Sequence, residues 1–209
     1  MIMADGGTQE RQTDNVIPPD RTPRLLLHCC CAPCASYVLE HLAPRYEITI
    51  LFYNPNISPR EEYERRAAEF NKLAALPGKA LFADMVVAGY DHDVFAAVSA
   101  PFRDEPEGGR RCRACIELRL KETAARAREG GFDCFTTTLS VSPHKNAGLI
   151  NSIGAVLASE SGVEFLSADF KKHDGYKRSV ELSRQYGLYR QSYCGCGIPE
   201  GKSVWQQVR

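Results

Sequence analysis

RLLLHCCCAPC, residues 24–34, decides the fold, because a short apolar run leads directly into four cysteines and a proline. Arg24–His28 has the length and apolarity of a buried strand. Pro33 fits the first turn of a helix, which we expect to continue over Cys34–Leu42. A strand, a tight loop and a helix in this order predict the first unit of an α/β fold.

The same alternation continues along the chain. Four more segments, rich in β-branched and aromatic residues or apolar in pattern, are predicted strands: 46–53, 80–87, 134–138 and 164–166. Apolar residues at helical spacing and capping residues predict helices from Pro59 to Pro77, over 91–100, around Ile116–Ala127 after a loop over 101–111, from an N-cap at Ser142 to Gly162, and over 176–186. This order predicts an α/β fold with a Rossmann-like parallel sheet of about five strands and helices on both faces.

The predicted domain covers residues 23–196. Residues 1–22 are polar and lack periodicity, so we expect a flexible N-terminal tail, and 197–209 form a C-terminal tail. Ligands of such sheets bind outside the carboxyl ends of the strands. Cys29–Cys34, Thr136–His144 and Asp169 each follow a predicted strand, so these segments are expected to converge on one mouth.

The composition narrows the function classes. Lys plus Arg and Asp plus Glu balance at 26 each, so a nucleic-acid partner would have to meet a local patch. The N-terminal residues show no signal-peptide pattern, and no apolar run is long enough to span a bilayer. The sequence therefore predicts a cytoplasmic protein without a membrane partner, in which clustered cysteines favour metal binding or catalytic redox chemistry over structural bridges.

Eight of the nine cysteines lie in three clusters. Cys30 and Cys31, together with Cys112-x-x-Cys115, offer four thiolates, which can enclose zinc or hold a [4Fe–4S] cluster. Adjacent cysteines favour the iron–sulfur interpretation, and a structural zinc site is the alternative. Cys29 leaves the register open, since it could replace either neighbour.

The remaining cysteines differ in how strongly they indicate redox chemistry. A disulfide across Cys194-Gly195-Cys196 would close a small strained ring, so a cycling redox pair is favoured over a second metal site or plain surface thiols. Cys31 and Cys34 form a Cys-x-x-Cys pair that could be a redox dithiol. The alternative is that Cys34 is simply a small buried residue of the helix. Cys134 begins an apolar strand and is expected in the core.

Polar residues near the predicted mouth are candidates for ligand binding. The hydroxyls and the His-Lys-Asn triplet between Thr136 and Asn146 suit an anion, although ordinary capping explains Ser142. Asp169 could ligate metal, donate a proton or pair with a neighbouring lysine. The best basic patch consists of Lys171, Lys172, Lys177 and Arg178. Its cations and neighbouring rings would suit nucleic acid, but on the residues alone a solvated charged face is the safer interpretation.

These blocks together resemble the QueH-type epoxyqueuosine reductases. The resemblance is carried by His28-x-Cys30-Cys31-Ala32-Pro33-Cys34, FYNPNISPREEYERR (52–66), EPEGGRRCRAC (105–115), FTTTLSVSPHKN (135–146), DFKKHDGYKRS (169–179) and YGLYRQSYCGC (186–196). The blocks appear in the family's order and cover nearly all of 24–196. Cys29 departs from the pattern, which affects the register of a cluster.

The resemblance implies a specific reaction. An epoxide on the cyclopentane ring of a modified wobble base in tRNA would be reduced to the alkene of queuosine, without cobalamin. Cys30, Cys31, Cys112 and Cys115 would hold a [4Fe–4S] cluster, and Cys194 and Cys196 would form a redox-active disulfide pair. The implied fold is that of the adenine-nucleotide α-hydrolases.

The implied reaction needs further groups that the resemblance does not identify. The proton donor is expected among Asp169, Tyr53 and His144, the basic patch is expected to hold the anticodon stem-loop, and the electron donor is unidentified. An iron–sulfur tRNA sulfurtransferase is an alternative, although cysteines occupy the place of its phosphate loop. A non-catalytic zinc-binding module is the second alternative function.

Overall fold

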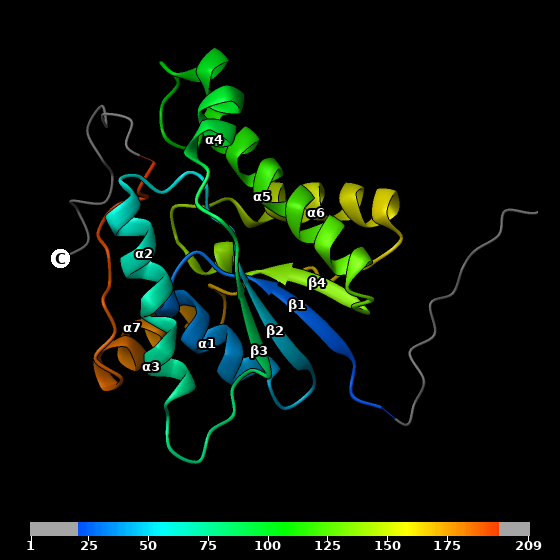
Figure 1. Ribbon diagram of the computed structural model, residues 1–209, viewed down its shortest axis with the longest axis vertical. Helices are drawn as coiled ribbons and strands as arrows, with labels where there is room; N and C mark the ends of the chain where they lie inside the picture. The colour runs from blue at the N-terminus through cyan, green and yellow to red at the C-terminus, as the bar shows by residue number, and fades with distance from the viewer. Residues whose placement is uncertain (1–20, 197–209) are drawn as a thin grey trace, which may run out of the picture.

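The computed structural model describes residues 21–196, so the predicted tails lie outside the described residues except for Arg21 and Thr22. Five strands form one parallel sheet in the order β3-β2-β1-β4-β5 (Figure 1). Their bounds are β1 Arg24–His28, β2 Glu47–Phe52, β3 Asp84–Val87, β4 Cys134–Thr137 and β5 Glu164–Phe165. The predicted α/β class and the parallel sheet are confirmed.

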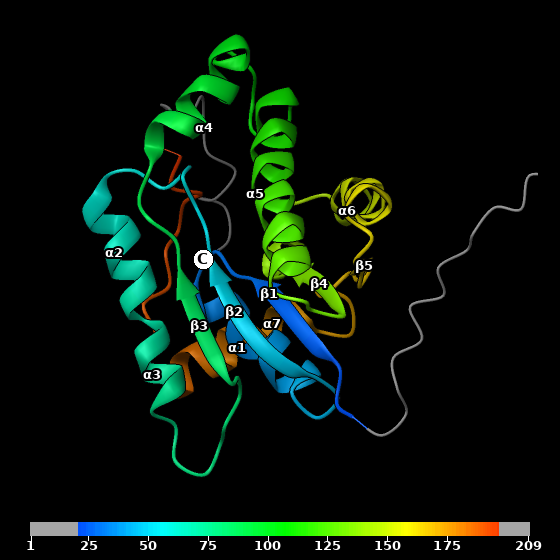
Figure 2. The ribbon, with the colours of Figure 1, turned by 45° about the vertical axis from the view of Figure 1, so that its right-hand side comes forward.

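Helices cover both faces of the sheet (Figure 2). The α-helices are α1 Ala32–Leu42, α2 Arg60–Ala68, α3 Phe70–Ala74, α4 His92–Ser99, α5 Arg110–Glu129, α6 Ala147–Ser161 and α7 Gly175–Gln185, and two 3₁₀ segments are η1 Ala100–Phe102 and η2 Thr138–Val141. Helices α5 and α6 lie together on one face, while α1 and α7 pack against each other on the opposite face.

Alternating side chains of β1 build two cores. Leu25 and Leu27 point into the core formed with α1, α3 and neighbouring segments, whereas Leu26 points into the core formed with α5 and α6. All three are at most 2% exposed. A strand that is apolar on both faces is what a central position in a parallel sheet requires, and β1 indeed pairs with both β2 and β4.

Two predicted helix starts differ from the structure. The helix expected from Ser142 begins at Ala147, because the side chain of Asn146 accepts the backbone N–H of Leu149 at 3.1 Å and caps it. Ser142 instead ends η2 in an extended conformation. The helix expected around Ile116 begins earlier, at Arg110, where a carboxylate oxygen of Glu105 accepts the backbone N–H at 2.9 Å.

Two other boundaries also move. The long helix expected from Pro59 is divided at Glu69 into α2 and α3, and the third strand begins at Asp84 rather than at Ala80. These shifts leave the order of elements unchanged, so the carboxyl edge of the sheet carries the segments that the sequence placed there.

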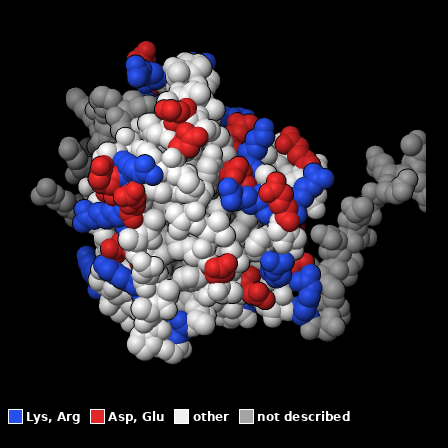
Figure 3. Space-filling view, in the orientation of Figure 1, with Lys and Arg blue, Asp and Glu red and all other residues white. Residues whose placement is uncertain are grey.

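The surface carries charges of both signs. Figure 3 shows Lys and Arg interspersed with Asp and Glu around a largely uncharged centre on this face. Within the described part of the chain, no helix combines the length and the apolarity that crossing a membrane requires.

Candidate metal and redox site

His28 joins the ends of three strands at the carboxyl edge of the sheet. The ring is fully buried, with Nε2 3.1 Å from the carbonyl oxygen of Tyr53 and Nδ1 2.8 Å from Oγ1 of Thr137. Since a carbonyl can only accept, Nε2 carries the hydrogen. Burial lowers the pKa of His28 to about 4, so the ring is neutral at pH 7. His28 therefore fixes the backbone from which the cysteine loop starts.

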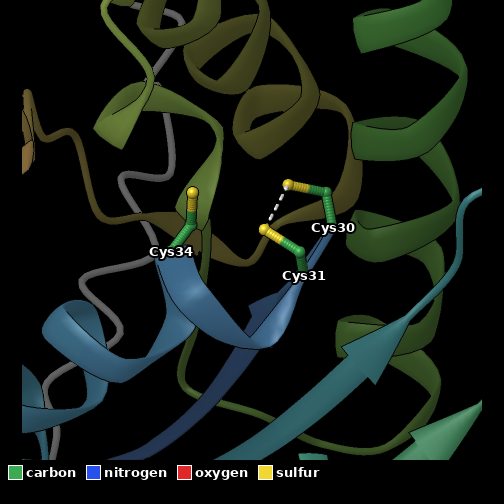
Figure 4. A group of neighbouring side chains, drawn as sticks. All are labelled: Cys30, Cys31 and Cys34. Atoms are coloured by element: carbon green, nitrogen blue, oxygen red, sulfur yellow. Dashed lines mark hydrogen bonds between the residues drawn. The ribbon is translucent and has the colours of Figure 1, made fainter. Parts of the chain in front are cut away.

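Three sulfurs gather directly after β1. The Sγ atoms of Cys30, Cys31 and Cys34 all lie within 4.8 Å of one another, and those of Cys30 and Cys31 are 3.9 Å apart (Figure 4). Cys34 reaches the group from the first turn of α1. Cys29 lies apart from it, fully buried in the core beneath α1. This triad could hold a metal.

The three thiols are not equivalent. Hydrogen bonds from Cys30 and Cys34 hold the pKa of Cys31 well below its ordinary value. A hydrogen bond with Cys30, followed by the one with Cys31, holds the pKa of Cys34 well above its ordinary value, and the bond with Cys31 raises the pKa of Cys30. A thiolate at Cys31 is thus surrounded by two thiol donors, an arrangement that suits a metal ligand with a supporting hydrogen bond.

Helix α5 presents the second pair of cysteines. Cys112 and Cys115 lie three residues apart near its N-terminus, where they share one face. The backbone N–H of Gly108 donates to Sγ of Cys112 at 3.2 Å, and the N-terminal helix dipole also favours negative charge there. Burial raises the pKa of Cys115. The last two residues of the loop predicted over 101–111 are thus already the first residues of this helix.

The third pair reaches the same edge from the far end of the chain. After α7, the segment runs alongside α2 toward the carboxyl edge of the sheet (Figures 1 and 2). Arg66 donates from Nη1 to the carbonyl oxygen of Cys194 at 3.2 Å, and the backbone N–H of Ser58 donates to that of Gly195 at 2.8 Å. Cys194 and Cys196 are both thiols in this structure.

Two adjoining cavities connect the three clusters. The first encloses about 50 Å³ and is lined by Cys30, Cys31 and Cys34, and the second encloses about 90 Å³ and is lined by Cys112 and Cys115. Both cavities share the same three lining residues, namely Cys194, Arg119 and Lys145. The two predicted ligand pairs thus line different cavities, and Cys194 lines both.

Three cations lie beside the sulfurs. The sequence pattern indicated only Lys145, within the triplet expected to suit an anion, and gave no role to Arg66 or Arg119. Arg66 and Arg119 are only 2% and 3% exposed, and Nζ of Lys145 lies 4.0 Å from Sγ of Cys194. A hydrogen bond from Cys196, followed by these three charges, holds the pKa of Cys194 well below its ordinary value. The signal available for Arg119 was its spacing, since it lies one helical turn after Cys115.

The predicted acid and basic patch are arranged differently. Asp169 is not among the described residues that line either cavity, and its carboxylate pairs with Nζ of Lys171 at 2.9 Å. Arg178 pairs with Glu40 through two nitrogens, each 2.9 Å from a carboxylate oxygen. Lys172 and Lys177 remain exposed. The roles of Asp169 and of this patch stay predictions.

Clusters of cysteines lie at the carboxyl edge of a parallel sheet, beside buried cations that can balance the charge of thiolates. This arrangement is typical of a protein that binds a metal or carries out thiol redox chemistry. The family model described as "Epoxyqueuosine reductase QueH" matches residues 25–201. The chain therefore belongs to the QueH family of epoxyqueuosine reductases, which are oxidoreductases, and the resemblance seen in the sequence is confirmed.

Curated relatives support the same assignment. An epoxyqueuosine reductase QueH from Streptococcus pyogenes serotype M1 is 44% identical over 181 residues, spanning 83% of this chain and 69% of the relative. One from Staphylococcus epidermidis is 42% identical over 183 residues, spanning 83% and 75%. One from Thermotoga maritima is 36% identical over 176 residues, spanning 82% and 88%. These likenesses favour a reductase over a sulfurtransferase or a zinc-binding module.

Proposed function

We propose that the protein reduces the epoxide of epoxyqueuosine at the wobble position of tRNA to the alkene of queuosine, without cobalamin and in the cytoplasm. A [4Fe–4S] cluster would be held by Cys30, Cys31, Cys112 and Cys115, and two electrons would come from a redox pair of Cys194 and Cys196. The observation that carries the proposal is the junction of the two sulfur-lined cavities at Cys194.

The donor set fits an iron–sulfur cluster. Four thiolates are the ligands such a cluster prefers, and they come here from the end of β1 and the start of α5. Arg119 and Lys145 line both cavities, so they can offset the negative charge of several thiolates. When bound, the cluster supplies one-electron transfer and a Lewis-acidic iron. The neighbouring Cys34 serves in this proposal as a thiol donor to Cys31 rather than as a ligand.

The redox pair balances the reaction. Converting the epoxide to an alkene consumes two electrons and two protons and releases water, and oxidation of two thiols to a disulfide supplies both. Cys194 is the member that lines the cavities, and the ammonium group of Lys145 favours its thiolate. His144, which lines the second cavity, is better placed than Tyr53 or Asp169 to protonate the leaving oxygen, because neither of these lines a cavity among the described residues.

Unpartnered polar atoms indicate that the first cavity takes a polar ligand. Within residues 21–196, three buried atoms of its lining residues have no hydrogen-bond partner: Oδ1 of Asn56, Nη2 of Arg66 and Oε1 of Gln191. A buried polar atom without a partner costs about 1–3 kcal/mol. Hydroxyl groups and ring nitrogens of a substrate would relieve this cost, because the three atoms include both donors and acceptors.

A nucleobase requires the mouth to open. The two cavities enclose about 50 Å³ and 90 Å³, well below the several hundred Å³ of typical ligand sites. Tyr176, Arg190 and Tyr193 line the first cavity, and Tyr193 is 37% exposed. We infer that the segment after α7 moves outward to admit the unstacked base, and that the aromatic rings then stack on it.

The nearby basic residues would hold the anticodon stem-loop. Lys172 and Lys177 are exposed and available for phosphate contacts, while Lys171 and Arg178 would first exchange their carboxylate partners. Phosphate contacts of this kind position a nucleic acid without reading its sequence. The affinity for tRNA should therefore fall steeply with salt.

Anaerobic incubation with tRNA that contains epoxyqueuosine and a reductant, followed by mass spectrometry of the nucleosides, tests the proposal. Cys112→Ala should lose the cluster absorption and the activity together. Cys194→Ser should keep the absorption but lose turnover, and Cys134→Ala, at a buried strand residue outside the cavities, should keep both. Full activity of Cys194→Ser would refute the redox-pair role.

A further inference from the structure

The two cysteines of the Cys194-Gly195-Cys196 pair line different cavities. Cys194 lines both interior cavities. Cys196 lines neither of these, but instead a third cavity of about 400 Å³, formed by Ser58, Cys196 and residues of and around α4. Gly195 between them is buried, with a φ of +95°. The pair thus connects the interior with a separate space on the other side of the segment.

The third cavity has a lining that is partly polar and partly apolar, and it includes one arginine. Among the described residues that line it, Arg103 is the one arginine or lysine, and none of them is an aspartate or a glutamate. Ser58, His92 and Ser99 supply further hydrogen-bonding groups, while Phe95 forms an apolar part of the lining. A volume of about 400 Å³ is ordinary for a small-molecule site. Its charge favours a small anion.

We propose that this third cavity binds the reductant of the enzyme, a low-molecular-mass thiol that carries a carboxylate, and delivers it to the sulfur of Cys196. The inference rests on the proposed redox role of Cys194 and Cys196. It assigns the two cysteines different tasks, since Cys194 serves the substrate side and Cys196 the reductant side.

The exchange balances in two steps. The thiolate of the reductant attacks Sγ of Cys196, a mixed disulfide forms, and the Cys194–Cys196 bond breaks with Cys194 leaving as a thiolate. A second thiol then attacks the reductant sulfur of the mixed disulfide, which releases Cys196 as a thiolate and the reductant as its disulfide. Two thiols are oxidised, and their two protons go to the two protein sulfurs through solvent.

Two features of the site favour this direction. Nζ of Lys145 lies 4.0 Å from Sγ of Cys194, and a positive charge beside the leaving sulfur speeds thiol–disulfide exchange. On the other side, Nδ1 of His92 lies 2.8 Å from the carbonyl oxygen of Pro55, so Nδ1 carries the hydrogen. With that hydrogen on Nδ1, Nε2 is the ring nitrogen that can accept the proton of the incoming thiol.

The test compares two thiols of equal length and opposite charge as sole reductants of the holoenzyme, namely 3-mercaptopropionate and cysteamine. The value of kcat/KM for each thiol is corrected for its thiolate fraction. The wild type should prefer 3-mercaptopropionate by about 5-fold, the upper end of what one exposed ion pair contributes. Arg103→Gln should lower this preference about 5-fold, and Arg45→Gln, an equal charge change at an exposed arginine outside the cavity, should retain it.

Adduct mapping checks which sulfur is attacked. The disulfide form of 3-mercaptopropionate should label Cys196 in Cys194→Ser at least about ten times faster than it labels Cys194 in Cys196→Ser, because the third cavity admits the probe. Equal preference for the two thiols, retention of the preference in Arg103→Gln, or faster labelling of Cys194 would each overturn the inference. The first of these results would point to a protein donor instead.

A single-turnover control separates this inference from the proposed function. Wild-type enzyme that has been fully reduced and freed of thiol should form about one queuosine per protein molecule. Failure there would refute the proposed redox pair itself. Success there, without charge selection among thiols, would refute only the reductant site.

Discussion

The guanidinium group of Arg66 occupies the space next to Gly195 in which the Cβ atom of any other residue would lie. A Cβ atom on Gly195 would come within 2.8 Å of Nη2 of Arg66, a distance that real contacts do not show. The same guanidinium binds the carbonyl oxygen of Cys194 at 3.2 Å and belongs to the lining of the first cavity. One buried arginine of α2 therefore sets the position of the proposed redox pair.

Gly195→Ala should displace this pair. Its φ of +95° is strained for any residue with a Cβ, and the contact with Arg66 adds a steric clash. We expect turnover to fall at least about 100-fold while iron content stays near that of the wild type, since a 1 Å misplacement can cost this much. Gly89→Ala is the control, because nothing lies within 4 Å of its added Cβ. Unchanged turnover in Gly195→Ala would show that the geometry of the segment is unimportant.

Arg66→Met should destabilise the fold as well as the site. Arg66 pairs with Glu62 at 2.7 Å, with side chains only 2% and 8% exposed, so the substitution leaves a buried carboxylate unpaired. We expect a loss of about 3–5 kcal/mol in the free energy of unfolding, measured by urea denaturation. Arg60→Met breaks a pair of the same spacing in the same helix, but both partners are 64% exposed, so it should cost less than about 1 kcal/mol. An equal loss of unfolding free energy in the two variants would contradict the conclusion that the Arg66–Glu62 pair is buried.

The fold could be predicted well because its strands carry a strong local signal. Arg24–His28 is apolar and flanked by a charged tail and a cysteine loop, and the structure confirms this strand residue for residue. The start of α6 could not be predicted as well, because Ser142 and Asn146 are both good N-caps. The choice between them depends on η2, which uses the residues up to Val141.

The site could be predicted only in part, for a similar reason. Cysteines stand out by their clustering, so the three sulfur groups were visible in the sequence. Arg66, Arg119 and Lys145 are three of 26 basic residues. The sequence offers only weak signals for two of them, the spacing of Arg119 after Cys115 and the place of Lys145 in the His-Lys-Asn triplet. They become significant only when α2, α5 and the segment before α6 pack around the carboxyl edge, which is a tertiary event.

Cys34→Ala tests whether this thiol is a ligand or a donor. In our proposal Cys34 donates a hydrogen bond to the thiolate of Cys31, so the variant should retain its iron and its cluster absorption. Losing a hydrogen bond to a ligand sulfur should lower the reduction potential of the cluster, and the activity should fall about 10–100-fold. Cys34→Ser, which keeps a donor, should recover much of both. Loss of iron from Cys34→Ala would instead make Cys34 a ligand of the metal.

Asp133 should make stability depend on acid pH, because it fastens the start of β1 to the turn before β4. Nη1 of Arg21 and the backbone N–H of Arg24 each donate to its carboxylate at 2.8 Å. Chiefly through the bond from Arg21, these contacts lower the pKa of Asp133. The contribution to stability is therefore complete above the unfolded pKa of about 3.9 and is lost as the pH falls toward the lower folded value.

Asp133→Asn should accordingly lower the free energy of unfolding by about 1 kcal/mol at pH 7. Its difference in Tm from the wild type should shrink as the pH is lowered from 4 toward 2.5, because the wild type then loses the same charge. Asp104→Asn, at an exposed carboxylate, should show little difference at any pH. A Tm difference for Asp133→Asn that stays constant down to pH 2.5 would mean that the shape of the side chain, rather than its charge, holds the two strands together.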